Sequence, residues 1–88
     1  MTHRKIYSIL KSILAELTGR QTREIFASQN LVVDLRFTNQ GKASLNVDIN
    51  RGFANEGSPI NPRLSPSETQ SSNTVRDLRK VISERFET

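Results

Sequence analysis

The sequence predicts a small α+β domain of order α-(α)-β-β-α, in which helices cover one face of a central antiparallel β-hairpin. Apolar residues alternate with polar ones in residues 31–37 and again in residues 43–50, as expected of strands with one buried face. They recur at intervals of three and four in residues 4–17 and 74–86, as expected of helices that bury one side. The 88 residues are enough for a single domain with a small core.

The first helix is predicted over residues 4–17. Its apolar face covers about 160° of the helix circumference, which is wide for a helix that lies on a two-stranded sheet. Part of this face is therefore expected to meet a second surface, such as a partner subunit. The face is made of Ile6, Tyr7, Ile9, Leu10, Ile13, Leu14 and Leu17.

A short second helix is predicted over residues 20–28. Thr18 followed three residues later by Gln21 fits a capping box, and the glycine between them is expected to end the first helix. A single bent helix over residues 4–28 is the alternative. The expected core contacts of the short helix are Ile25 and Phe26.

The hairpin is predicted to turn at residues 39–41, where Gly41 is free to adopt a positive φ. A three-residue loop pairs Leu35 with Leu45 and avoids placing two aspartates opposite each other. A wider loop, which pairs Arg36 with Asp48, is the competing register. The buried strand residues are expected to be Leu31, Val33, Leu35, Phe37, Leu45, Val47 and Ile49.

Residues 51–73 hold all three prolines of the chain together with many serine, asparagine and threonine residues, which predicts a long irregular loop. The last helix is predicted over residues 74–86. Thr74 and Asp77 have the spacing of an N-terminal capping box.

The net charge of +4 is concentrated at the start of the chain. Residues 1–23 contain five basic side chains and one acidic one, whereas the basic and acidic side chains of residues 24–88 balance. No cysteine is present, which excludes thiol catalysis and thiolate metal sites. No segment approaches the length of an apolar membrane span, so a cytoplasmic protein without membrane association is expected.

No catalytic, cofactor-binding or metal-binding residues are predicted, and the protein is expected not to be an enzyme. His3 is the only histidine and lies close to the N-terminus, where no neighbour is expected to orient it. Asp34 and Asp48 share the predicted outer face of the hairpin, but no third metal ligand accompanies them. The glycines do not form a phosphate-binding loop.

The open edges of a two-stranded sheet predict a homodimer that completes the sheet across a two-fold axis. Contact through the wide first-helix face is the alternative. The predicted function is that of a non-enzymatic binding or accessory module that acts through contact with an unidentified protein partner. The candidate contact residues are Tyr7, Leu10, Leu14, Phe53, Ile60 and Leu64.

The alternative function is that of a basic nucleic-acid-binding or regulatory protein, because positive side chains attract phosphate groups. A helix-turn-helix motif does not fit, since an alternating segment stands where the recognition helix belongs. The candidate nucleic-acid contacts are Arg4, Lys5, Lys11, Arg20, Arg23, Arg76, Arg79 and Lys80.

Overall fold

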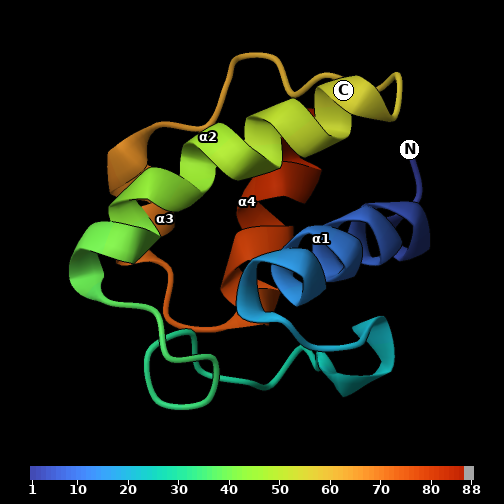
Figure 1. Cartoon of the computed structure of the whole chain (residues 1–88). Coiled ribbons are helices and arrows are strands. Elements are labelled where there is room, and N and C mark those ends of the chain that lie inside the picture. Colours follow the sequence, from blue (N-terminus) through green and yellow to red (C-terminus); the bar gives the residue numbers. More distant parts are fainter. Residues whose placement is uncertain (87–88) are drawn as a thin grey trace.

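In the computed structural model, which describes residues 1–86, the chain folds into helices joined by two long connections (Figure 1). The described residues contain no β-strand, and the single β-bridge among them joins Asn30 to Thr74. The predicted α+β fold with a central hairpin is therefore wrong, because the domain is all-helical. The elements in chain order are α1 (His3–Thr18), the 3-10 helix η1 (Thr22–Glu24), α2 (Asn39–Asn55), α3 (Pro66–Ser71) and α4 (Val75–Phe86).

Helix α1 lies where the apolar spacing predicted a helix. It begins after Thr2, whose Oγ1 accepts a hydrogen bond from the Lys5 N–H (3.1 Å), and it ends at Gly19, which has a φ of 69°. Its wide apolar face does not require a partner subunit, since α2, α4 and η1 of the same chain all contact α1. The buried residues of α1 are Ile6, Ile9, Leu10, Leu14 and Ala15.

The predicted short helix over residues 20–28 is reduced to the single turn η1. The capping box that starts this turn joins Gln21 to Glu24, whose Oε1 accepts a hydrogen bond from the Gln21 N–H (2.9 Å). The Thr18 hydroxyl, predicted to act as the cap, instead donates to a carbonyl one turn earlier in α1 (2.7 Å). Because the chain leaves the helical conformation at Gly19, the alternative of one bent helix is also wrong.

The predicted first strand, residues 31–37, is a compact loop. The backbone N–H of Leu35 donates to the carbonyl of Asn30 (3.1 Å), so the chain turns back within a few residues instead of extending. Leu31 and Leu35 are buried, but Val33, which the alternating pattern placed beside them, faces solvent. A strand and a tight loop can both bury Leu31 and Leu35. Only a strand would also bury Val33, so the exposure of Val33 distinguishes the two conformations.

The predicted second strand, residues 43–50, lies within helix α2. Thr38 caps this helix, since its Oγ1 accepts a hydrogen bond from the Gly41 N–H (2.9 Å). Val47, which alternation predicted to be buried, is exposed on the outer face. With both strands absent, neither predicted hairpin register applies. The buried apolar residues of α2 are Leu45, Ile49 and Phe53, whose spacing of four residues is that of a helix.

Residues 51–73 are not one irregular loop. Residues 51–55 complete α2 and Pro66–Ser71 form α3, which leaves residues 56–65 as the connection. The Ser65 Oγ accepts a hydrogen bond from the Glu68 N–H (3.3 Å), and the Glu68 carboxylate accepts one from the Ser65 N–H (3.0 Å). This capping box, with a proline in the first turn, starts α3.

Helix α4 lies where it was predicted and runs behind and between α1 and α2 (Figure 1). Its predicted capping box is confirmed: the Asp77 N–H donates to the Thr74 Oγ1 (3.2 Å), and the Thr74 N–H donates to an Asp77 carboxylate oxygen (3.1 Å). Burial raises the pKa of Asp77, but hydrogen bonds from the backbone N–H groups of Asn73 and Thr74 outweigh it and hold that pKa below its ordinary value. Phe86 stacks on Phe53, with ring centroids 6.2 Å apart.

Helices α1 and α2 approach each other closely at Gly52. A Cβ atom at this position would overlap the Cδ1 and Cγ1 atoms of Ile13 in α1. The absence of a side chain at Gly52 therefore sets how near the two helices lie. The buried apolar residues outside α1 and α2 are Ile25, Leu31, Leu35, Ile60, Leu64, Val75, Leu78 and Ile82.

Candidate interaction surface

Residues 30–37, named here the valine loop, are held by hydrogen bonds from two of their own side chains. The Oδ1 of Asn30 accepts from the backbone N–H groups of Val32 and Val33 (2.9 Å each). The Oδ2 of Asp34 accepts from the backbone N–H of Asn30 (2.7 Å). These contacts satisfy the backbone donors of an exposed turn in the way that asparagine and aspartate caps do.

The valine loop is also tied to the rest of the molecule. Leu31 and Leu35 are buried in the core, and the Leu31 N–H donates to the Asn73 carbonyl just before α4 (2.8 Å). From the other side, the guanidinium of Arg20 donates to the Asp34 carbonyl (3.1 Å). The loop is thus fixed from within and at both of its sides.

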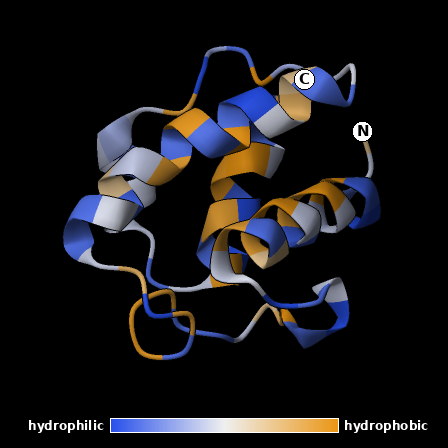
Figure 2. Cartoon of the chain, in the orientation of Figure 1, coloured by the Kyte–Doolittle hydropathy of each residue, from blue (hydrophilic) through white to orange (hydrophobic). Residues whose placement is uncertain are grey.

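The two valines of this loop face solvent. Val33 is 71% exposed and Val32 is 42% exposed, so the pair forms an apolar tip at the edge of the molecule. Figure 2 shows this segment as a partly orange loop that projects at the lower edge of the molecule, below the first turn of α2. Contiguous exposed apolar patches are typical of surfaces that bind another molecule, and the two valines are adjacent in the chain.

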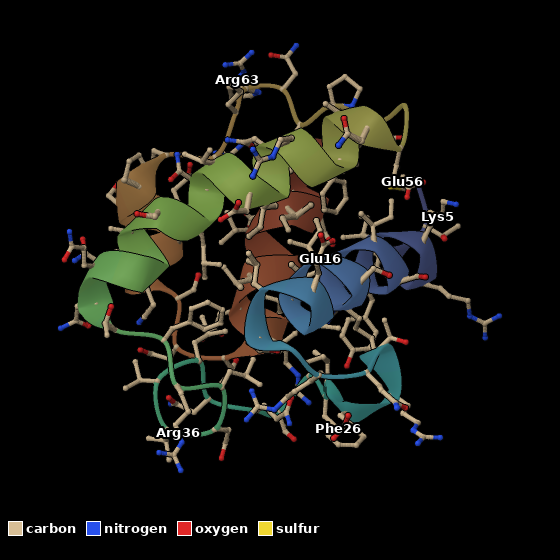
Figure 3. All side chains as sticks on the ribbon, viewed as in Figure 1. Lys5, Glu16, Phe26, Arg36, Glu56 and Arg63 are labelled. Carbon is tan, nitrogen blue, oxygen red and sulfur yellow. The ribbon has the colours of Figure 1, made fainter. Side chains whose placement is uncertain are left out.

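Arg36 ends the tip with a φ of 67°, in the left-handed region that non-glycine residues rarely occupy. Such a conformation costs about 1–2 kcal/mol and persists only where the surrounding contacts impose it. Arg36 and Phe26 both lie along the same edge of the molecule (Figure 3). Phe26 was predicted to be in the core, but its side chain is exposed, whereas its neighbour Ile25 is buried.

A second candidate surface is a groove between α2 and the connection 56–65, with a volume of about 380 Å³. Its wall is fixed by Asn50, which accepts a hydrogen bond from the Leu64 N–H (3.0 Å) and donates one to the Leu64 carbonyl (3.1 Å). Asn46 donates to the same carbonyl (3.2 Å). The groove is lined by Asn46, Val47, Asn50, Arg51, Ala54, Pro59, Ile60, Arg63 and Leu64.

Most of the candidate protein-contact residues from the sequence are core residues of this chain. Tyr7 is half-buried, and the other five side chains lie in the hydrophobic core, so surface contacts in these regions depend on their neighbours. The buried five are Leu10, Leu14, Phe53, Ile60 and Leu64. Val32 and Val33 are not among these candidates, and Val33 was predicted to be buried in the hairpin.

The candidate nucleic-acid contacts are spread over three parts of the surface. Arg4 and Lys11 line one pocket beside η1, and Arg20 supports the valine loop. Arg79 of α4 lies 2.8 Å from the Nδ1 of His3 in the first turn of α1, so basic residues from both ends of the chain are neighbours. Arg4, Lys5, Arg23, Arg76 and Lys80 are exposed, whereas Lys11, Arg20 and Arg79 are half-buried.

The described residues contain no group of three histidine, cysteine or carboxylate side chains that is arranged to hold a metal ion. Asp34 and Asp48, which the hairpin prediction placed on one face, belong to different elements. Asp34 caps the valine loop, and Asp48 pairs with Arg51 on α2 (2.6 Å).

The sequence matches no protein-family model, and no curated protein is significantly similar to it. Among residues 1–86, no helix has both the length and the apolar character that crossing a membrane requires. The geometry of the described surface is therefore the basis for a functional proposal.

The spacing of polar residues held a signal for the valine loop. Asn30 followed four residues later by Asp34 places two capping side chains around two valines, and Thr38 three residues before Gly41 marks the start of a helix. The alternation of apolar residues in the same segment predicted a strand instead, which is why the loop was not predicted.

Proposed function

We propose that this protein is a non-enzymatic binding module that contacts a protein partner through the valine loop. The partner surface has an apolar hollow that accepts Val32 and Val33 and an acidic rim. The exposure of two adjacent valines on a loop that is fixed by its own side chains is the observation that supports this proposal most strongly.

The rigidity of the loop favours binding. A flexible loop loses conformational entropy when it binds, at a cost of about 0.5–1.5 kcal/mol for each immobilised side chain. Valine has few rotamers, and Asn30 already holds the backbone at Val32 and Val33, so little freedom is left to lose.

The charges beside the tip favour an acidic partner. Arg20 and Arg36 flank the loop, and Asp34 is its only carboxylate, so the border of the tip carries a net positive charge. Opposite charge at the rim of an interface accelerates association and selects among partners more than it adds to affinity. Complex formation is therefore expected to slow as the salt concentration rises.

The test introduces a photo-crosslinking amino acid at position 33 and, as a matched control, at position 47. Val47 is also an exposed valine, 58% accessible, but it lies on α2 beside the groove. In the cells that produce this chain, we expect the crosslinker at position 33 to capture a partner protein and the crosslinker at position 47 to capture none. The captured protein is then purified, and its affinity is measured by calorimetry against the unmodified chain, Val33→Asp and Val47→Asp.

Val33→Asp is expected to weaken the affinity by about a hundredfold, because it places a charge against an apolar surface, whereas Val47→Asp leaves it unchanged. Equal effects of the two substitutions contradict the proposal. Loss of binding only in Val47→Asp assigns the interface to the α2 groove instead. Circular dichroism of each variant verifies that the fold is intact.

The homodimer was predicted from the open edges of a sheet, and this reason no longer applies because residues 1–86 contain no sheet. A second copy of this chain is one possible occupant of the apolar tip, and sedimentation at tens of micromolar distinguishes it. A species of 10.0 kDa indicates a monomer that binds other proteins. A dimer that dissociates in Val33→Asp assigns the tip to self-association.

One observation favours the alternative function, nucleic-acid binding: Arg79 of α4 lies against the first turn of α1, near the excess of basic residues there. A gel shift tests it. Duplex DNA or RNA that binds at micromolar protein in about 150 mM salt supports this function, and loss of binding there contradicts it.

A further inference from the structure

A pocket of about 300 Å³ lies between α1 and η1, away from the valine loop and from the α2 groove. Its volume is at the lower end of the ~300–1,000 Å³ range of small-molecule sites. Three successive turns of α1 form one side of it, and η1 provides the other. The lining residues are Arg4, Tyr7, Ser8, Lys11, Ser12 and Thr22.

The lining of this pocket is cationic and rich in hydroxyl groups. Arg4 and Lys11 contribute two positive charges, and no aspartate or glutamate lines it. Neither cation forms an ion pair with a carboxylate among residues 1–86. The nearest carboxylate along η1, that of Glu24, accepts a hydrogen bond from the Gln21 N–H (2.9 Å) and so caps its own turn.

Two polar side chains of the pocket, Lys11 and Ser12, are positioned by contacts within α1. The Nζ of Lys11 lies 5.0 Å from the centroid of the Tyr7 ring, a cation–π contact that orients the ammonium group. The hydroxyl of Ser12 donates to the Ser8 carbonyl (3.1 Å). The hydroxyls of Ser8 and Thr22 form no hydrogen bond within the described part of the chain, which leaves both free to donate into the pocket.

We infer that this pocket binds a phosphate group, either as inorganic phosphate or as the phosphomonoester of a small molecule. The oxygens of a phosphate accept hydrogen bonds from guanidinium, ammonium and hydroxyl donors, and all three are present. A dianion balances the charges of Arg4 and Lys11 together. The backbone positions of these residues are seven residues apart, about 10 Å along the helix, and both side chains line the same pocket.

A small phosphate ligand fits these observations better than a nucleic-acid backbone. Both cations line one pocket of limited volume, whereas a phosphodiester chain needs a track of cations along a groove. Lys5, one residue after Arg4 on the same helix, does not line the pocket. This difference between adjacent cations makes a discriminating test possible.

The test is a titration of the full chain, followed by ¹H–¹⁵N correlation spectra at constant ionic strength, with sodium phosphate exchanged for sodium chloride. Saturable shifts are expected at the amides of Ser8, Lys11 and Thr22. Arg4→Gln and Lys11→Gln are each expected to weaken binding by about tenfold, as the loss of a charge-assisted hydrogen bond predicts. Lys5→Gln, which removes the same charge from an adjacent position, is expected to change it less than twofold.

Two further probes distinguish the sources of the phosphate group. Ribose 5-phosphate that binds more tightly than inorganic phosphate indicates a phosphorylated small molecule, and equal binding indicates the free ion. A short oligothymidylate is the third probe, and binding of this probe alone overturns the inference in favour of a phosphodiester. Non-saturable shifts, or an equal loss in Lys5→Gln and Arg4→Gln, also overturn it, since they indicate diffuse attraction to the net charge.

Discussion

The two long connections of this domain are both fixed by asparagine side chains, but in opposite ways. The valine loop is held by Asn30, which belongs to the loop itself, and its tip residues Val32 and Val33 face solvent. The connection 56–65 is held by Asn50, which belongs to the neighbouring helix α2. The valine loop, whose tip is held from within, presents Val32 and Val33 outward while its two leucines anchor it in the core. The connection that is held from outside uses its apolar residues to cover a helix.

The largest difference between the two connections is expected when an apolar side chain is truncated in each of them. Leu64→Ala is expected to lower the free energy of unfolding by about 2–4 kcal/mol, because Leu64 is buried and a cavity would remain. Val33→Ala, at an exposed position, is expected to change it by less than about 0.5 kcal/mol. Urea denaturation measures both. A large loss in Val33→Ala would show that the valine stabilises the fold and would remove the main support for the proposed function.

The asparagines provide the next comparison. Asn50→Ala removes both hydrogen bonds to the Leu64 backbone and is expected to cost about 2 kcal/mol, since the partly buried Leu64 N–H loses its acceptor, whereas the Leu64 carbonyl keeps the hydrogen bond from Asn46. Asn30→Ala removes two bonds at an exposed turn and is expected to cost about 1 kcal/mol.

Hydrogen exchange locates these two effects. Asn30→Ala is expected to accelerate exchange at the amides of Val32 and Val33 alone, because the loop is fixed locally. Asn50→Ala is expected to loosen residues 56–65 and the α2–α3 contact together. A global change in both variants would mean that the two connections do not differ in the way described.

A substitution at Arg36 tests whether backbone strain is present in the valine loop. Arg36→Gly is expected to raise the free energy of unfolding by up to about 1 kcal/mol, because glycine adopts a φ of 67° without strain. Thermal denaturation measures the gain, and Arg36→Ala, which keeps the strain, is the control. Stabilisation by both substitutions would attribute the effect to charge and not to backbone conformation.

The smallest expected effect depends on pH and concerns the ion pair between α3 and α4, whose arginine also contacts the connection 56–65. Arg85 donates to both carboxylate oxygens of Glu68 (2.6 Å each) and to the Pro62 carbonyl (3.1 Å), so this pair ties the connection to α4. Hydrogen bonds from the Arg85 side chain, and then from the Ser65 backbone, hold the pKa of Glu68 below its ordinary 4.5. Just below pH 4.5 the unfolded chain therefore binds more protons than the folded one.

The contribution of Glu68 is thus complete above pH 4.5 and is lost as the pH falls through the lowered pKa of the folded state. Denaturation midpoints measured between pH 6 and pH 3 are expected to fall less steeply in Glu68→Gln than in the unmodified chain. Parallel curves for the two proteins would show that the ion pair does not stabilise the connection.

The sequence predicted the two terminal helices because each has a long apolar stripe at helical spacing, and in α4 the Thr74–Asp77 capping box also marked the start. The middle of the chain was predicted wrongly because Leu45 and Ile49 satisfy both a period of two and a spacing of four. Phe53, four residues after Ile49, is the residue that decides for a helix. In residues 30–37 the side chains of Asn30 and Asp34, rather than the apolar pattern, determine the conformation.

The candidate surfaces were less accessible to prediction than the helices. The apolar residues that stood out in the sequence, such as Leu10 and Leu64, are buried in the core. The surface is therefore formed by the residues between them in the chain. The association of Arg4 and Lys11 with η1 requires the chain to fold back after Gly19, which no local pattern specified. Periodicity predicted the buried face of the two terminal helices but not that of residues 31–50, and the meeting of distant polar groups depends on the tertiary path.

The close approach of the helices at Gly52 couples the residue allowed at position 52 to the residue at position 13 on α1. Any methyl group gained at position 52 must be matched by a loss of bulk at Ile13, for example to valine or alanine, or the two helices must separate. Homologues of this chain are therefore expected to vary at these two sites in a reciprocal manner, with a larger residue at one accompanied by a smaller residue at the other.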